Sequence, residues 1–199
     1  MEVPMTSGKP PLGMRGNRFP PLTWETMSPE QAAMADSVLS GKRGSMQGPY
    51  NVLLRSPDLG QLAQAFGAHT RFQSSLPLAL NELAILLVAR AWTSQFVWWA
   101  HRKMAVDAGL DEALVLAIAK GAPPPAMNAE VAAVFGFCSE LLERKQVSDE
   151  KFAAAKALFG ERGVVDLMGS MGYYTFVCMS LNVDQYPLPD GVAPELGPL

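Results

Sequence analysis

Apolar residues along this chain recur mainly at the spacing of an α-helix. In residues 56–73, for example, Leu59, Leu62 and Phe66 are three or four positions apart, which places their side chains on one helix face. No segment shows the alternation of a half-buried strand, so the pattern predicts an all-α protein. The expected helices span residues 28–41, 56–73, 75–92, 95–107, 110–121, 128–146, 147–160 and 161–182, and a short apolar turn lies around NVLL.

The helical pattern covers the middle of the chain and leaves both ends out. Segment 75–92 is apolar on nearly every face, so we expect it to be a central buried helix. Residues 1–22 and 186–199 are rich in Pro and have no periodicity. We therefore expect a single helical domain over residues 23–185, between an extended N-terminal arm and a Pro-rich C-terminal tail. Such arms gain order most readily by lying across a neighbouring subunit.

Composition narrows the class of protein. Hydrophobic residues make up 49% and charged residues 18% of the chain, which is typical of a globular protein. A net charge of −3 without a basic run argues against a nucleic-acid partner. No signal peptide is recognisable, and no uncharged apolar run reaches the roughly 18 residues of a membrane span. The apolar segment 161–182 contains Asp166, which favours a helix in the protein core or at a subunit interface over a membrane span. We therefore expect a cytoplasmic protein with no membrane partner.

Polar residues interrupt the most apolar stretch, NELAILLVARAWTSQFVWWAH at residues 81–101. A buried carboxylate without a partner would cost several kcal/mol, so Glu82 needs an ion pair, with Arg90 for example, or another polar neighbour. If the helix breaks near Thr93, Glu82 and His101 lie on successive helices that can pack around one pocket. His101 can then transfer a proton with Glu82 as its relay, the alternative being a histidine with a role only in the core.

The helix that begins near Gln95 carries further candidates. By the i, i+3, i+4 rule, Ser94, Val97, Trp98 and His101 are expected on one side of it. Ser94 at the helix N-terminus favours an anion. Gln95 either caps the helix or donates a hydrogen bond to a carbonyl substrate. Trp98 and Trp99 are expected to form core or pocket wall.

Candidates outside this stretch are fewer. Arg43 and Arg71 lie in or near loops, where each is either a carboxylate clamp or a solvated surface residue, and Tyr173 can point its hydroxyl at the pocket. Cys138 and Cys178 lie in apolar surroundings and are expected to be buried thiols. With two histidines and no carboxylate cluster, the chain offers no metal-binding motif.

The order of Glu82, Ser94, Val97 and His101 resembles a motif of the carboxymuconolactone decarboxylase superfamily, which includes the alkylhydroperoxidase D-like proteins. In the peroxidase branch, a glutamate is followed twelve positions later by Cys-x-x-Cys and, after three further residues, by histidine. This chain keeps Glu82 and His101 in register and has Ser94 and Val97 at the cysteine places. RFPPL, RGSMQGPYNVLLRSPDL and VVDLMGSMGYYTFVCMSLNV are similar to the decarboxylase-like branch, so the resemblance covers roughly residues 18–188.

The resemblance implies an alkylhydroperoxidase D-like helical bundle that works as a cofactor-independent lyase, decarboxylase or isomerase. Its small-molecule substrate would be an unsaturated lactone or a related carbonyl acid. No cofactor is implied, because a conjugated substrate is its own electron sink. Members of the family assemble as trimers or hexamers, which implies a homo-trimer or homo-hexamer here. The implied catalytic residues are His101 for proton transfer and Glu82 as relay, and the implied substrate-binding residues are Gln95, Trp98, Ser94, Arg71 and Tyr173.

Two other functions compete with the lyase. Many decarboxylase-like members carry a glutamate at the place of Val97, and its replacement favours a non-catalytic member that binds a small ligand or serves in assembly. A thiol peroxidase is disfavoured, because Ser94 and Val97 replace the two cysteines that its chemistry needs.

Overall fold

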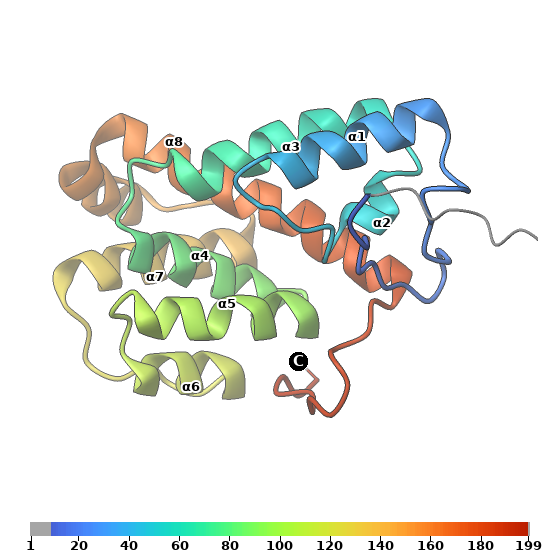
Figure 1. Cartoon of the computed structure of the whole chain (residues 1–199). Coiled ribbons are helices and arrows are strands. Elements are labelled where there is room, and N and C mark those ends of the chain that lie inside the picture. The colour runs from blue at the N-terminus through green and yellow to red at the C-terminus, as the bar shows by residue number, and fades with distance from the viewer. Residues whose placement is uncertain (1–8, 199) are drawn as a thin grey trace, which may run out of the picture.

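A computed structural model describes residues 9–198, and this part of the chain contains eight helices and no strand (Figure 1). The predicted all-α class is therefore confirmed. The helices are α1 (Pro29–Ser40), α2 (Tyr50–Leu53), α3 (Pro57–Phe72), α4 (Leu78–Ala91), α5 (Gln95–Asp107), α6 (Glu112–Lys120), α7 (Ala129–Arg144) and α8 (Asp149–Asp184).

The helix boundaries follow local signals. The Ser28 hydroxyl accepts a hydrogen bond from the backbone of Gln31, whose side chain accepts one from the Ser28 backbone, and this capping box begins α1. α8 contains the two helices expected over 147–160 and 161–182, separated by a kink where they were expected to meet. Gly160 marks their junction, because its φ of 67° lies in the left-handed region that glycine adopts without strain.

α4 forms the centre of the larger core. All of its residues from Leu80 to Ala89 are buried, as expected for a helix that is apolar on every face. α5, α7 and α8 pack around it (Figure 1). By length and composition α8 could cross a membrane, but 56% of its most apolar window is buried inside the domain, which is the behaviour of a core helix.

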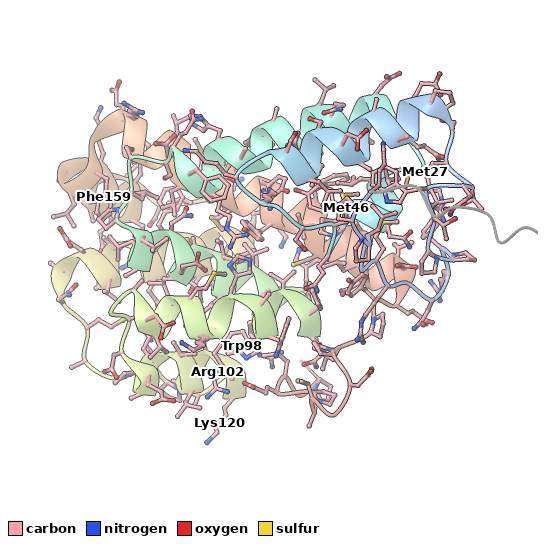
Figure 2. All side chains as sticks on the ribbon, in the orientation of Figure 1. Met27, Met46, Trp98, Arg102, Lys120 and Phe159 are labelled. Carbon is pink, nitrogen blue, oxygen red and sulfur yellow. The ribbon has the colours of Figure 1, made fainter. Side chains whose placement is uncertain are left out.

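Residues 9–22 and 186–198 of the two extended arms pack on their own chain, and residues 1–8 lie outside the part that the structure describes. Asp184, at the end of α8, accepts hydrogen bonds from the backbone N–H groups of Asn17 and Phe19, at 3.2 Å and 2.8 Å. In the C-terminal tail, Tyr186 and Leu196 are buried. The chain itself thus covers apolar side chains of both arms, and the expectation that the arms lie across a neighbouring subunit stays a prediction. The N-terminal arm packs Leu12, Met14, Leu22, Trp24 and Met27 against a second, smaller core that includes Met34 and Met46 (Figure 2).

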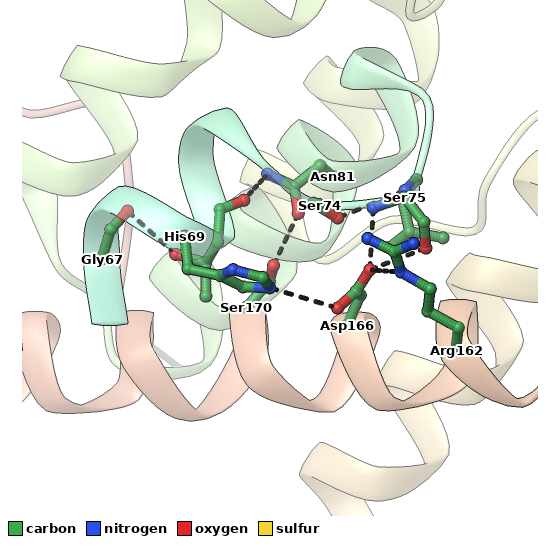
Figure 3. Close-up of polar contacts among 10 residues, drawn as sticks. Gly67, His69, Ser74, Ser75, Asn81, Arg162, Asp166 and Ser170 are labelled. Carbon is green, nitrogen blue, oxygen red and sulfur yellow. Dashed lines mark hydrogen bonds and ion pairs between the residues drawn. The ribbon is translucent and has the colours of Figure 1, made fainter. Parts of the chain in front are cut away.

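A polar network joins α3, α4 and α8 next to Glu82 (Figure 3). Asn81 donates to the Thr70 carbonyl at 3.2 Å and accepts from the Ser170 hydroxyl at 2.6 Å. Nearby, Asp166 accepts hydrogen bonds from the backbone and hydroxyl of Ser75 at 2.7 Å and 2.6 Å. Burial alone would raise the pKa of Asp166, but the bonds from Ser75, the His69 contact and the charge of Arg162 together lower it. These bonds fix the start of α4 against α8.

Candidate functional site

A carboxylate and an imidazole meet in the interior between α4 and α5. Glu82 Oε2 lies 2.7 Å from His101 Nδ1, and the two residues are 1% and 5% exposed. Glu82 therefore pairs with His101 and not with Arg90. An ionised carboxylate at this distance holds the proton on Nδ1 and leaves a lone pair on Nε2.

A cavity of about 280 Å³ lies on the other side of the imidazole. His101 is part of its wall, whereas Glu82 is not, so Glu82 supports the ring from behind. Within residues 9–198 no side chain or backbone group forms a hydrogen bond with His101 Nε2. The cavity is lined by Arg43, Ser45, Gln47, Gly48 and Pro49 from the loop before α2, Tyr50 from α2, Arg71 from α3, Phe96, Val97, Trp99, Ala100 and His101 from α5, and Tyr173, Tyr174, Val177 and Leu181 from α8.

Three tyrosines give the cavity neutral hydrogen-bond donors. Burial raises the pKa of Tyr50, Tyr173 and Tyr174 above the ordinary phenol value, so their hydroxyls keep their protons at neutral pH. The Tyr174 ring stands edge-to-face against His101, with centroids 4.8 Å apart, and holds the imidazole from a second side. The buried Tyr50 hydroxyl has no hydrogen-bond partner among the residues described.

Two arginines make the cavity positive. The Arg43 guanidinium lies 5.8 Å from the Tyr50 ring and 5.9 Å from the Tyr173 ring, and it donates to the Tyr173 hydroxyl at 3.4 Å. Arg71 contacts the sulfur of Met104 at 3.3 Å. Over residues 9–198 neither arginine forms an ion pair with a carboxylate. The cavity therefore has two cationic groups available for an anion.

Gly67 allows α3 to approach this wall of the cavity. A Cβ at this position would overlap the Tyr173 ring and would lie 2.6 Å from Arg43 Nη2. The ring and the guanidinium thus occupy the space that any other residue type would fill. No hydrophobic pattern indicates this role for Gly67, because its consequence is seen only after α3 and α8 have packed.

Only some of the predicted site residues lie at the cavity. Arg71 and Tyr173 line it, as His101 does, but Gln95, Trp98 and Ser94 do not. That they bind substrate stays a prediction, and helix geometry gives the reason for their position outside the cavity. Successive residues of a helix differ by about 100° in direction, so once His101 and Val97 face the cavity, Trp98 faces another side. Trp99 lines the cavity, as one of the two positions expected in core or pocket wall, whereas Tyr50 and Phe96 are cavity residues that sequence reasoning missed.

Gln95, Trp98 and Ser94 have other surroundings. Gln95 and Trp98 form hydrogen bonds with the C-terminal tail, in contacts to Leu196 and Glu195. Ser94 is buried beside Cys178. It precedes the first residue of α5, as expected, but forms no side-chain cap.

The cysteines have the properties of core residues. Cys138 and Cys178 are free and buried. Burial raises the pKa of the Cys138 thiol, and it raises that of Cys178 to about 12 against the opposing effect of a hydrogen bond with Ser94. Neither thiol is therefore a reactive thiolate near neutral pH. Among residues 9–198, no group of three His, Cys, Asp or Glu side chains is arranged to hold a metal ion.

No protein-family model matches this chain, and no curated protein matches it either. The functional conclusion therefore comes from the residues of the cavity and from the spacing of Glu82 and His101.

Proposed function

We propose that this protein is a cofactor-independent lyase, or isomerase, that acts on an unsaturated lactone or a related carbonyl acid. The observation that carries the proposal is the 2.7 Å contact of Glu82 Oε2 with His101 Nδ1, with the imidazole in the wall of the cavity. A carboxylate behind one ring nitrogen fixes the tautomer and prepares the other nitrogen for proton transfer. The resemblance to the decarboxylase-like branch points in the same direction.

His101 is the proton-transfer residue of this proposal. In an isomerisation, Nε2 takes a proton from the carbon next to the carbonyl and returns it to a different carbon. In a decarboxylation, the bond to the leaving CO₂ breaks, its electron pair enters the conjugated carbonyl, and protonated His101 delivers a proton to the resulting enolate. Glu82 stabilises the imidazolium form in either case, which lowers the barrier to forming it.

The rest of the cavity suits a small anionic substrate. Its volume of about 280 Å³ is at the lower end of small-molecule sites, which hold about 300–1,000 Å³, so a compact acid fits better than a dinucleotide or a polymer. Arg43 and Arg71 can hold the carboxylate. The role of carbonyl donor, which the sequence assigned to Gln95, passes to the neutral hydroxyl of Tyr50 or Tyr173, since these line the cavity.

Val97 favours the competing proposal of a ligand-binding protein without catalysis. It lines the cavity with an apolar side chain where many decarboxylase-like proteins have a carboxylate, so only His101 remains as a proton carrier on this helix. Such a protein would bind the same class of acid in the same cavity. The two proposals differ in one observable, because only the lyase or isomerase forms a product.

Turnover of carbonyl acids decides between the two. Purified protein is incubated with a panel of unsaturated lactone acids, and loss of the conjugated absorbance and release of CO₂ are followed. We expect turnover to disappear in His101→Ala and in His101→Gln, because an amide does not titrate, while both variants stay folded. His69→Ala is the matched control, because His69 is the other histidine and is about half exposed beside Asp166. The ligand-binding protein would be established instead if the wild type bound a lactone acid without turning it over and the His101 variants bound it equally well.

We also propose that the chain assembles as a homo-trimer or homo-hexamer in the cytoplasm. Its support is that both α3 and α8 carry large exposed apolar side chains, among them Leu62 at 71% and Val165 at 59% exposure, which association of subunits would cover. Light scattering at micromolar concentration should give a multiple of the 21.4 kDa chain mass, and a single-chain mass would contradict it. Leu12, Met14 and Asn17 of the N-terminal arm pack on their own chain. Deletion of residues 1–17 should therefore lower the melting temperature, whereas the mass measured by light scattering should change less.

A further inference from the structure

The outer face of α5 binds the end of the chain through its backbone. Gln95 Nε2 donates a hydrogen bond to the Leu196 carbonyl at 2.7 Å, and Gln95 Oε1 accepts from the N–H groups of Glu195 and Leu196, each at 3.1 Å. One side-chain amide thus pairs with an extended segment in both directions. Figure 1 shows this C-terminal segment, at the red end of the colour scale, lying beside the start of α5.

The same face also recognises side chains of the tail. Arg102 Nη1 donates to Glu195 Oε1 at 2.7 Å, and Trp98 Nε1 donates to Glu195 Oε2 at 3.1 Å, so both carboxylate oxygens are bound. The Leu196 side chain is only 5% exposed and joins the core. Trp98 and Arg102 lie on the α6 side of α5 (Figure 2). At the end of α4, Arg90 donates to the carbonyls of Gly197 and Pro198, at 3.1 Å and 3.5 Å.

We infer that this face, formed by Gln95, Trp98, Arg102 and Arg90 and here named the tail site, is a peptide-recognition site. Its ligand is a short extended peptide of the type Pro-Glu-Leu-Gly, which the chain itself supplies as residues 194–197. The combination of backbone pairing, a carboxylate held by two donors and one buried apolar anchor is how folded domains select linear peptides. This inference is independent of the proposed reaction, because Gln95, Trp98 and Arg102 lie outside the cavity.

Docking of the tail is reversible. Arg102 and Glu195 keep 32% and 36% of their side chains exposed, so their ion pair is screened by salt and is not locked in the core. Residues 187–193, which connect the docked segment to the domain, form no helix and are mostly half-buried or exposed. A linker of this length holds the tail near its site at a millimolar effective concentration. The site is therefore filled by its own tail and can exchange it for the same segment of another molecule.

Peptide binding to the full chain tests the inference. The probe is a fluorescent peptide of sequence GVAPELGPL, residues 191–199, and binding is followed by anisotropy. In the full-length Glu195→Ala/Leu196→Ala variant the chain's own tail no longer competes, so the peptide should bind saturably and at least about tenfold more tightly than to the wild type. A peptide that carries Gln in place of the glutamate should bind about tenfold more weakly, because it loses charge-assisted hydrogen bonds.

Two further variants give the result its specificity. Adding Arg102→Ala to the tail variant should reduce the difference between the two peptides, because only Trp98 Nε1 then remains as a donor to the glutamate. Lys120→Ala, a charge loss on neighbouring α6, should leave the difference intact. Failure of the folded tail variant to bind millimolar peptide, or equal binding of both peptides, overturns the inference. Should the tail variant not fold, hydrogen exchange of the wild type tests the inference. The amides of Glu195 and Leu196 should exchange at least about tenfold more slowly than that of Ala193, and they should lose this protection when peptide is added. Equal exchange rates at the three amides overturn the inference.

Discussion

Substitution of Glu82 separates its structural role from its chemical one. Glu82 is buried and its Oε2 holds His101 Nδ1 at 2.7 Å. In Glu82→Gln, the side-chain amide still reaches Nδ1 with its oxygen or its NH₂, so a charge-assisted bond becomes a neutral one at a cost of about 1–1.5 kcal/mol. In Glu82→Ala, the whole bond of about 1.5–3 kcal/mol is lost, the imidazole N–H is left without a partner, and a buried methylene worth about 0.8 kcal/mol disappears. Relief of carboxylate desolvation and the helix propensity of alanine offset part of this loss.

The expected destabilisation is therefore about 1 kcal/mol for Glu82→Gln and about 3 kcal/mol for Glu82→Ala. For a chain of 199 residues, in a size range where 1 kcal/mol shifts the melting temperature by about 2–4 °C, the shifts should be about 2–4 °C and about 6–12 °C. Thermal unfolding followed by circular dichroism measures both. Glu143→Gln on the exposed face of α7 is the matched control and should shift the melting temperature by less than about 1 °C.

Turnover should follow a different order. A glutamine can turn its NH₂ toward Nδ1 and force the proton onto Nε2, which removes the lone pair that faces the cavity, so Glu82→Gln should lower kcat by about 10²–10⁴-fold despite its mild effect on stability. Nitrogen-15 NMR reports the tautomer without any substrate, and with only two histidines in the chain the His69→Ala spectrum assigns the signals. A wild-type tautomer together with wild-type turnover in Glu82→Gln would refute the reasoning.

Two further predictions concern the packing around the cavity and the thiols. Gly67→Ala should destabilise the protein by about 1 kcal/mol, because overlap with Tyr173 costs about 1–3 kcal/mol and alanine recovers about 1 kcal/mol of helix propensity. In the control Gly172→Ala, the new Cβ meets no atom within 4 Å, so this variant should have a higher melting temperature. A higher melting temperature in both variants would contradict the close approach of Gly67 to Tyr173. Replacing Cys138 and Cys178 together by Ser should lower the melting temperature, since two hydroxyls become buried, but leave turnover nearly intact, and loss of turnover in the folded variant would show that a thiol takes part in the chemistry.

Helix positions could be predicted from the sequence because their signals are local. The helix expected near residues 95–107 has those bounds in α5, and α1 differs from its expected range by one residue at each end. Periodicity and capping residues act over one or two turns, so they need no knowledge of the fold. The junction between the last two expected helices was also placed correctly, since the φ of 67° and ψ of −179° at Gly160 interrupt the helical geometry inside α8.

The tail and the outer face of α5 could not be predicted in this way. Gln95 and Trp98 contact residues about 100 positions later in the sequence, and the tail has no periodicity that points to them. Polar side chains near His101 were therefore assigned to a substrate, although the chain itself supplies their partner. The same limit applies to Arg43 and Tyr50, which reach the cavity from a loop and from a four-residue helix.

The pairing of Glu82 with His101 was predictable because the turn between their helices is short. Glu82 precedes Thr93 by eleven residues and His101 follows it by eight, which correspond to about 16 Å and about 12 Å along antiparallel helices at 1.5 Å per residue. The two positions differ by less than the 5.4 Å of one helical turn, a gap that their side chains can bridge. Thr93 has a φ of 46°, a left-handed conformation that is uncommon for a β-branched residue, and it lets the Ser94 N–H bond to the Ala89 carbonyl at 2.8 Å. The tightness of this turn, together with the need of a buried carboxylate for a partner, leaves His101 as the polar group in reach of Glu82.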